Sequence, residues 1–153
     1  IMMPKIQELI NQAQDRYLVT DELGLMEGYV SSLPDRLKLY KQIRDREIDL
    51  LQTVADQVSR ELPSVTDEDL ETGIKNLILV LRYSSMAMLL NDESFLKQRL
   101  LNWLEGIMSM RDMRRLNETL YKLLNQGMRQ QFSPAQLTLI QPLITAAQVT
   151  LIY

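Results

Sequence analysis

The sequence contains no cysteine and no histidine, and this double absence removes many of the side chains on which enzymes and metalloproteins depend. Without cysteine, the chain forms no disulfide, no thiolate nucleophile and no thioether link to a prosthetic group. Without histidine, it has no imidazole general base, no proximal histidine for haem and no Cys/His metal site. Catalysis by a pair of carboxylates stays open, but the 20 acidic residues are spread along amphipathic segments, which is typical of solvated faces. The sequence therefore predicts a protein that is not an enzyme and holds no metal.

Glycine and proline are also scarce, with five of each in 153 residues, which favours long helices over a turn-rich β protein. The length suits one domain spanning residues 1–153. A net charge of −3 gives no electrostatic case for binding nucleic acid. Residues 1–5 lack the basic and apolar regions of a signal peptide, so we expect an intracellular or intraorganellar protein, whether or not a transit peptide has been removed.

The most apolar stretch of the chain, residues 73–92, does not have the composition of a membrane-spanning helix. Lys75, Asn76 and Arg82 interrupt it, so no uninterrupted apolar run reaches the length of about 18 residues that a spanning helix needs. Its apolar residues follow helical spacing on several faces. We therefore predict a buried core helix rather than a membrane span.

Helical periodicity with start and stop signals predicts the segments before this stretch. Pro4 suits the first turn of a helix, and Thr20 or Asp21 is expected to cap a second one, which Pro34 interrupts or restarts. Residues 35–62 are expected to form one long helix or two abutting ones.

Residues that end or cap helices mark the later segments. The signals are Pro63 as a helix end, Thr66 as an N-cap ahead of an acidic cluster, Asn91 and Asp92 as a break, and Ser133 with Pro134 as a helix start. Further helices are predicted over residues 94–107 and 112–128. The sum is an all-α, globin-like array of about eight helices, which the mixed lengths favour over a four-helix bundle.

Three blocks of sequence share a pattern with a known family. They are residues 16–23 (Arg-Tyr-Leu-Val-Thr-Asp-Glu-Leu), 81–92 (Leu-Arg-Tyr-Ser-Ser-Met-Ala-Met-Leu-Leu-Asn-Asp) and 99–104 (Arg-Leu-Leu-Asn-Trp-Leu). These blocks resemble the Arg-Tyr-Leu-Ser-x-x-Glu-Leu, Leu-Arg-Tyr-x-Thr-Tyr-Ala-x-x-Ala-Gly-Asp and Arg-Cys-Leu-Asn-Gly-Leu motifs of the phycobiliproteins, the light-harvesting globins that include allophycocyanin and phycocyanin. The last third of the chain matches only in its helical pattern. The resemblance implies a phycobiliprotein-type globin fold with an N-terminal helical pair.

The chain departs from the family at the pigment site. Aligned on Leu81 and Arg82, the bilin-attachment cysteine of the family falls at Gly73, its arginine at Lys75 and its aspartate at Asn76. Without the cysteine no thioether to a bilin can form, and without the aspartate the pyrrole N–H groups lose their charged acceptor. The connection from Pro63 to Gly73 is also shorter than the family's loop. The sequence thus predicts a degenerate bilin site with no covalent cofactor, and non-covalent tetrapyrrole binding is disfavoured.

The family's pigment-free branch, the bilin biosynthesis-associated globins, implies a function for such a chain. We expect a non-catalytic interaction or regulatory partner in bilin (tetrapyrrole) biosynthesis, with haem oxygenase or a bilin reductase as the candidate partner. The alternatives are a pigment-free phycobilisome subunit or assembly factor, and a non-covalent tetrapyrrole-binding module in which some of the nine methionines line the pocket. The expected location is the cytoplasm of a cyanobacterium or the plastid stroma, with the thylakoid periphery as an option.

Association between phycobiliprotein subunits involves the N-terminal helical pair, so the resemblance suggests a protein interface there. The candidate interface residues are Ile6, Leu9, Ile10, Leu25 and Met26 on this pair, with Arg111 and Arg115 on a basic face around the helix predicted over residues 112–128. A core role for the apolar residues and a solvated face for the arginines are the competing interpretations. A homodimer is one assembly that such an interface permits.

Overall fold

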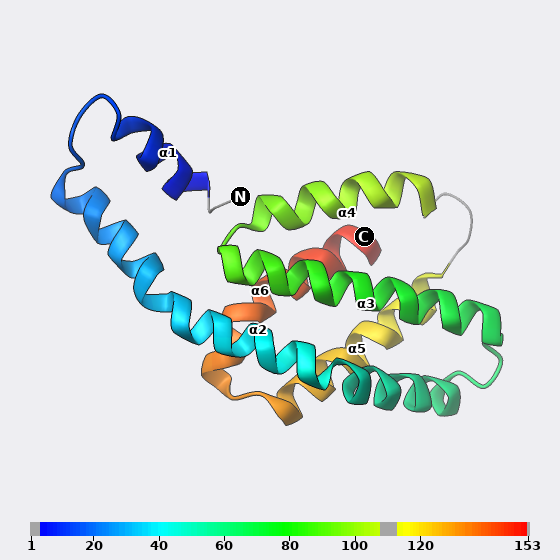
Figure 1. The fold of residues 1–153 in the computed structure, drawn as a ribbon. Coiled ribbons are helices and arrows are strands. Elements are labelled where there is room, and N and C mark those ends of the chain that lie inside the picture. Colours follow the sequence, from blue (N-terminus) through cyan, green and yellow to red (C-terminus); the bar gives the residue numbers. More distant parts are fainter. Residues whose placement is uncertain (1–3, 108–112, 153) are drawn as a thin grey trace.

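The structure, a computed structural model, describes residues 4–107 and 113–152. Within these residues the chain forms helices and no strand. The helices are α1 (Pro4–Gln12), α2 (Thr20–Glu61), α3 (Asp67–Leu90), α4 (Glu93–Ile107), α5 (Arg114–Gln131) and α6 (Pro134–Ile152) (Figure 1). The all-α class is confirmed.

The described residues contain six helices, so the prediction of about eight was wrong. The main difference is α2, which runs unbroken for 42 residues through Pro34. Proline removes one backbone hydrogen bond from a helix and usually bends or breaks it. Pro34 and the residue whose carbonyl loses its partner, Val30, are both exposed, so water can satisfy that carbonyl and the helix continues.

The helix ends follow the predicted capping chemistry at most positions. The Thr66 hydroxyl accepts a hydrogen bond from the Asp69 amide, and the Ser133 hydroxyl accepts one from the Gln136 amide. Asn91 adopts the left-handed conformation at φ 50° that ends α3. The start of α2 differs from expectation: neither Thr20 nor Asp21 caps it, and the Glu22 carboxylate instead accepts from the Val19 amide at 2.9 Å.

Helix α3 lies at the centre of the fold, where it contacts α2, α4, α5 and α6. Leu77, Val80, Leu81, Ala87 and Met88 are buried along it. Among the described residues, α3 is also the one helix long and apolar enough to cross a membrane by length and composition. Its contacts on several sides are those of a core helix, which passes the same test.

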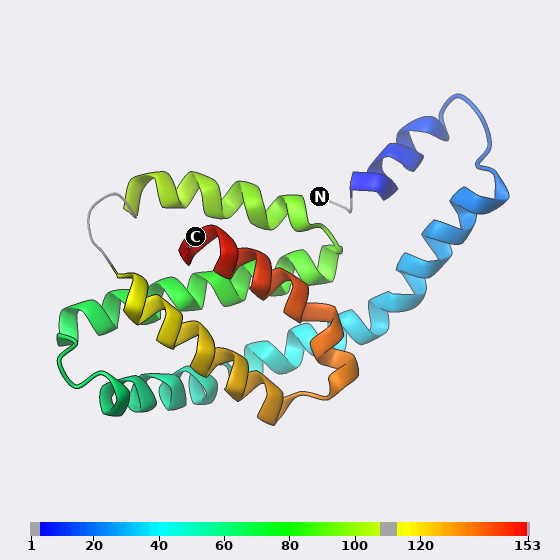
Figure 2. The same cartoon turned by 180° about the vertical axis from the view of Figure 1, so that it is seen from behind.

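The chain divides into a compact body and a projecting arm. We define the arm as residues 4–37, which comprise α1, the connection after it and the first part of α2. Figures 1 and 2 show from opposite sides that the arm extends away from the other helices. Within the described residues, α1 packs on α2 alone. The body therefore contains most of the core, and the arm presents most of its surface to solvent.

Candidate functional site

Gly73, the position predicted to correspond to the family's bilin-attachment cysteine, is closed by packing. Gly73 lies in the second turn of α3 and is buried. A Cβ atom built on Gly73 would stand 2.8 Å from Cδ1 of Leu120 and 3.3 Å from Cδ2 of Leu116. The backbone of α3 thus approaches α5 so closely that leucine side chains fill the space that a side chain at position 73 would need.

Of the other two residues predicted for the degenerate bilin site, Lys75 points away from Gly73, whereas Asn76 lies three residues after Gly73 on nearly the same side of α3. Lys75 is exposed, and its ammonium forms an ion pair with Glu71 at 2.9 Å, one turn back on the same helix. Asn76 is half-buried. Two residues along an α-helix differ by about 200° in direction, so Lys75 and Gly73 face nearly opposite sides of α3.

A small cavity lies beside this closed position, where the turn between α2 and α3 meets the start of α5. Its volume is about 220 Å³, and Leu116 lines both this cavity and the contact with Gly73. Pockets for drug-sized ligands usually measure about 300–1,000 Å³. Arg115, one of the predicted interface residues, lines the cavity together with Asp69, whereas Arg111 lies outside the described residues.

The acidic cluster at the start of α3 has a structural role. Asp67, Glu68 and Asp69 occupy the first turn, where carboxylates stabilise the positive end of the helix dipole. In the part of the chain that the structure describes, no group of three or more acidic residues is arranged to hold a metal ion.

The arm carries most of the exposed apolar surface. Two large hydrophobic residues of the body, Ile48 and Val149, are exposed in the described residues, and every other exposed one lies between positions 10 and 37. Those residues are Ile10, Tyr17, Val19, Leu23, Leu25, Val30 and Leu37. Monomeric soluble proteins rarely expose so many large apolar side chains in one region, so this surface is a candidate protein interface.

The predicted interface residues on the arm separate into two groups. Ile6 and Leu9 are 3% and 5% exposed, because α1 packs them against α2 within the arm. Ile10 and Leu25 are exposed, and Met26 is half-buried. Their role in binding a partner stays a prediction, but in this chain Ile6 and Leu9 hold the arm together.

The base of the arm is tied to the C-terminal end of α3. The Arg36 guanidinium donates to the Met88 carbonyl at 2.6 Å, and the Tyr29 hydroxyl donates to the Leu89 carbonyl at 3.4 Å. These carbonyls belong to the last turn of α3, where few backbone amides remain to pair with them, and the Met88 carbonyl also accepts from the Asn91 amide at 3.1 Å. Partial burial lowers the pKa of Arg36, which nevertheless stays charged at any physiological pH. The arm is thus docked by a cation at the negative end of the central helix.

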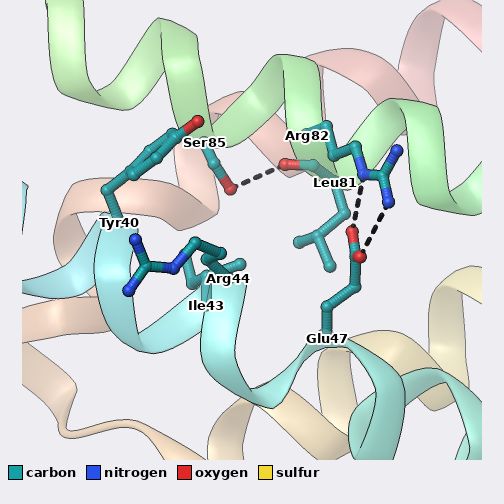
Figure 3. A pocket seen from close by; sticks show the side chains of 7 residues that line it. All are labelled: Tyr40, Ile43, Arg44, Glu47, Leu81, Arg82 and Ser85. Carbon is teal, nitrogen blue, oxygen red and sulfur yellow. Dashed lines mark hydrogen bonds and ion pairs between the residues drawn. The ribbon is translucent and has the colours of Figure 1, made fainter.

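A groove opens next to the base of the arm, between α2 and α3 (Figure 3). Its volume is about 280 Å³, and its lining residues are Tyr40, Ile43, Arg44 and Glu47 from α2 and Leu81, Arg82 and Ser85 from α3. Arg82 binds Glu47 through two hydrogen bonds of 3.0 Å, which raise the pKa of Arg82. The Ser85 hydroxyl donates to the Leu81 carbonyl at 2.7 Å. Sequence analysis did not predict this groove, since its two walls lie about 40 residues apart in the chain.

Comparison with known proteins decides the family. The family model described as phycobilisome protein matches residues 8–146. The chain belongs to the phycobilisome protein family. A curated relative, allophycocyanin subunit beta-18 of Pyropia yezoensis, is 31% identical over 98 residues, which cover 59% of this chain and 58% of the relative. The match thus spans less than two thirds of that relative's length.

Family membership confirms the predicted resemblance and the all-α, globin-like fold class. It also relates the closed position at Gly73 and the exposed arm to the same family of proteins. This phycobilisome-family chain has no cysteine anywhere in its sequence, and its Gly73 is closed by α5. Its N-terminal helical pair buries Ile6 and Leu9 but leaves other apolar residues, such as Ile10 and Leu25, exposed.

Proposed function

We propose that this protein is a non-catalytic, pigment-free member of the phycobilisome family that acts by binding a protein partner through its arm. The observation that carries the proposal is the contrast between the closed position at Gly73 and the exposed apolar side chains at positions 10–37. A surface of this kind is stabilised when a partner removes it from water. The absence of cysteine and histidine supports a role without chemistry of its own.

We infer further that the partner belongs to the machinery that makes or uses bilins. An enzyme of bilin synthesis, such as haem oxygenase or a bilin reductase, is the first candidate, because a phycobilisome-family chain without pigment chemistry is suited to regulate or escort such an enzyme. A phycobilisome subunit is the alternative, and the relationship to an allophycocyanin subunit favours it. Either partner would place the protein in a cyanobacterium or a plastid, near the thylakoid membrane.

Co-purification from a bilin-producing lysate tests the proposal. Tagged wild-type protein is compared with Val30→Glu, which places a charge on the arm, and with Val149→Glu as the matched control on the body. Val30 and Val149 are 56% and 54% exposed, so neither change is expected to unfold the protein. We expect the wild type and Val149→Glu to recover the same tetrapyrrole enzyme or phycobilisome subunit, and Val30→Glu to lose it.

Two outcomes would count against the proposal. Recovery of neither class of partner under conditions that preserve weak complexes would remove the interaction role. Equal recovery by Val30→Glu and the wild type would place the interface elsewhere than on the arm.

A pigment-free state is the second part of the proposal and has its own test. The cavity of about 220 Å³ beside Gly73 is small for a tetrapyrrole. In an absorption titration with haem, biliverdin and a reduced bilin, we expect no spectral change beyond that of the free ligands. A saturable shift would instead establish a non-covalent tetrapyrrole-binding module.

A further inference from the structure

The groove between α2 and α3 has unused hydrogen-bond donors at one end (Figure 3). Tyr40 and Arg44 lie one turn apart on the same face of α2, so both side chains reach this end. Asp45 accepts from Nε of Arg44 at 2.9 Å. The described residues provide no hydrogen-bond partner for the Tyr40 hydroxyl or for the two terminal nitrogens of Arg44. This end of the groove can therefore bind an acceptor from outside the chain.

The charges that line the groove favour an anion. They are the guanidinium groups of Arg44 and Arg82 and the carboxylate of Glu47. Glu47 is matched by Arg82 through their two hydrogen bonds of 3.0 Å at the opposite end. The pair of Arg44 with Asp45 is exposed to water and uses only Nε, so a second carboxylate can share this guanidinium. The terminal nitrogens of an arginine form the fork that binds a carboxylate through two parallel hydrogen bonds.

The floor of the groove is apolar. Ile43 and Leu81 line it and are 3% and 0% exposed. The Ser85 hydroxyl donates to the Leu81 carbonyl, so the one hydroxyl donor beside this floor is already used. Figure 3 shows Leu81 and Ser85 between the two polar ends of the groove. A ligand that crosses the floor thus needs an apolar body, because a polar one would lose its hydrogen bonds to water there.

We propose that this groove binds a small monocarboxylate with a compact apolar body. The carboxylate accepts hydrogen bonds from Arg44 and from the Tyr40 hydroxyl, and the apolar body lies on Ile43 and Leu81. The volume of about 280 Å³ is below the range of about 300–1,000 Å³ that is usual for drug-sized ligands, so a single ring suits it and a tetrapyrrole does not. None of the residues that line the groove belongs to the arm or to the degenerate bilin site.

Sodium benzoate is a suitable probe, because it joins one carboxylate to one apolar ring. In an amide NMR titration of the full chain, we expect saturable shifts of residues 40–47 and 81–85, with a dissociation constant in the low millimolar range. Benzamide has the same shape without the charge, and acetate has the charge without the ring. Each should bind at least about tenfold more weakly than benzoate, since each lacks one half of the recognition.

Substitutions assign the binding to this groove. Arg44→Gln removes the fork and should weaken benzoate binding at least about tenfold, and Tyr40→Phe removes one donor and should weaken it about threefold. Lys41→Gln is the matched control, because Lys41 is an exposed cation of the same helix that does not line the groove. It should bind benzoate like the wild type. Circular dichroism shows whether each variant folds.

The proposal is overturned if benzoate gives no saturable shift up to about 50 mM, if benzamide binds as tightly, or if Arg44→Gln binds like the wild type. Equal weakening by Lys41→Gln and Arg44→Gln would also overturn it, since that result indicates a diffuse attraction of anions to α2. These outcomes are distinct from failure of the proposed function, which depends on a protein partner of the arm and needs no ligand in the groove.

Discussion

The arm and the body use the same helix in opposite ways. In the arm, α2 exposes Leu23, Leu25 and Val30, whereas in the body it buries Leu50, Val54 and Val58 almost completely. Both parts have helical apolar spacing, and the body part is covered because α3, α5 and α6 contact α2. The comparison shows that amphipathic spacing marks a face for burial, while the neighbouring helices determine whether this chain alone can bury it.

The largest difference in stability between the two regions should appear when one leucine in each is replaced by alanine. Leu124 in α5 is 0% exposed and Leu23 is 45% exposed. Leu124→Ala should lower the free energy of unfolding by about 3 kcal/mol through lost burial and a new cavity, whereas Leu23→Ala should change it by less than about 0.5 kcal/mol. Urea denaturation at low protein concentration measures both. Similar losses for the two variants would show that the arm is as well covered as the body.

The next largest change in stability should come from Arg36, which joins the arm to the body. Arg36→Met removes the hydrogen bond from the guanidinium to the Met88 carbonyl and should lower the free energy of unfolding by about 1–3 kcal/mol. Lys38→Met is the control, because Lys38 is an exposed cation two residues away. Hydrogen exchange of the arm amides should accelerate in Arg36→Met alone. Unchanged exchange there would mean that the arm is held mainly by other contacts.

Glycine-to-alanine substitutions should change the stability of the protein in opposite directions in the arm and in the body. Gly28→Ala in the arm meets no atom within 4 Å and should stabilise the protein by up to about 1 kcal/mol through helix propensity. At Gly73 the added Cβ comes 2.8 Å from the Leu120 side chain, so that repacking outweighs the propensity gain and Gly73→Ala should destabilise the protein by about 1 kcal/mol. Thermal unfolding measures both. Stabilisation by Gly73→Ala would show that α5 moves easily and that the space at Gly73 is less closed than its packing indicates.

The smallest effect concerns the start of the arm helix. Hydrogen bonds from Arg16 and then from the Val19 amide lower the pKa of Glu22 from 4.5 to about 2. Because the folded pKa lies below the ordinary value, the stabilisation is fully present above pH 4.5 and is lost as the pH falls toward 2. An NMR titration of the Glu22 carboxyl carbon should show the low pKa, and Arg16→Ala should raise it. An ordinary pKa in the wild type would remove the ion pair as a feature of the arm in solution.

Much of the fold was predictable because local signals dominate helices. Thr66, Asn91 and Ser133 mark helix ends through short-range hydrogen bonds or backbone conformation, and each fulfils that role. Pro34 misled the prediction, since an exposed helix tolerates a proline whose lost hydrogen bond water replaces. The helix count was therefore too high.

The candidate sites were predictable only in part. The degenerate residues at Gly73, Lys75 and Asn76 follow from alignment with the family pattern, but the closure of Gly73 depends on Leu116 and Leu120, which lie more than 40 residues later. The groove beside the arm joins Glu47 to Arg82, and nothing near either residue in the sequence indicates the pairing. Contacts between residues so far apart depend on how the helices cross.

The sequence by itself determined that this protein is helical and that it has no thiol to attach a pigment, because these properties depend on residue identity and local spacing. Only the tertiary structure decided that Ile6 and Leu9 are buried within the arm, that other apolar residues of the arm stay exposed and that Leu116 and Leu120 of α5 close the space at Gly73. Burial is a property of the whole packing arrangement, and side chains with the same local pattern become core or surface according to which distant helices reach them.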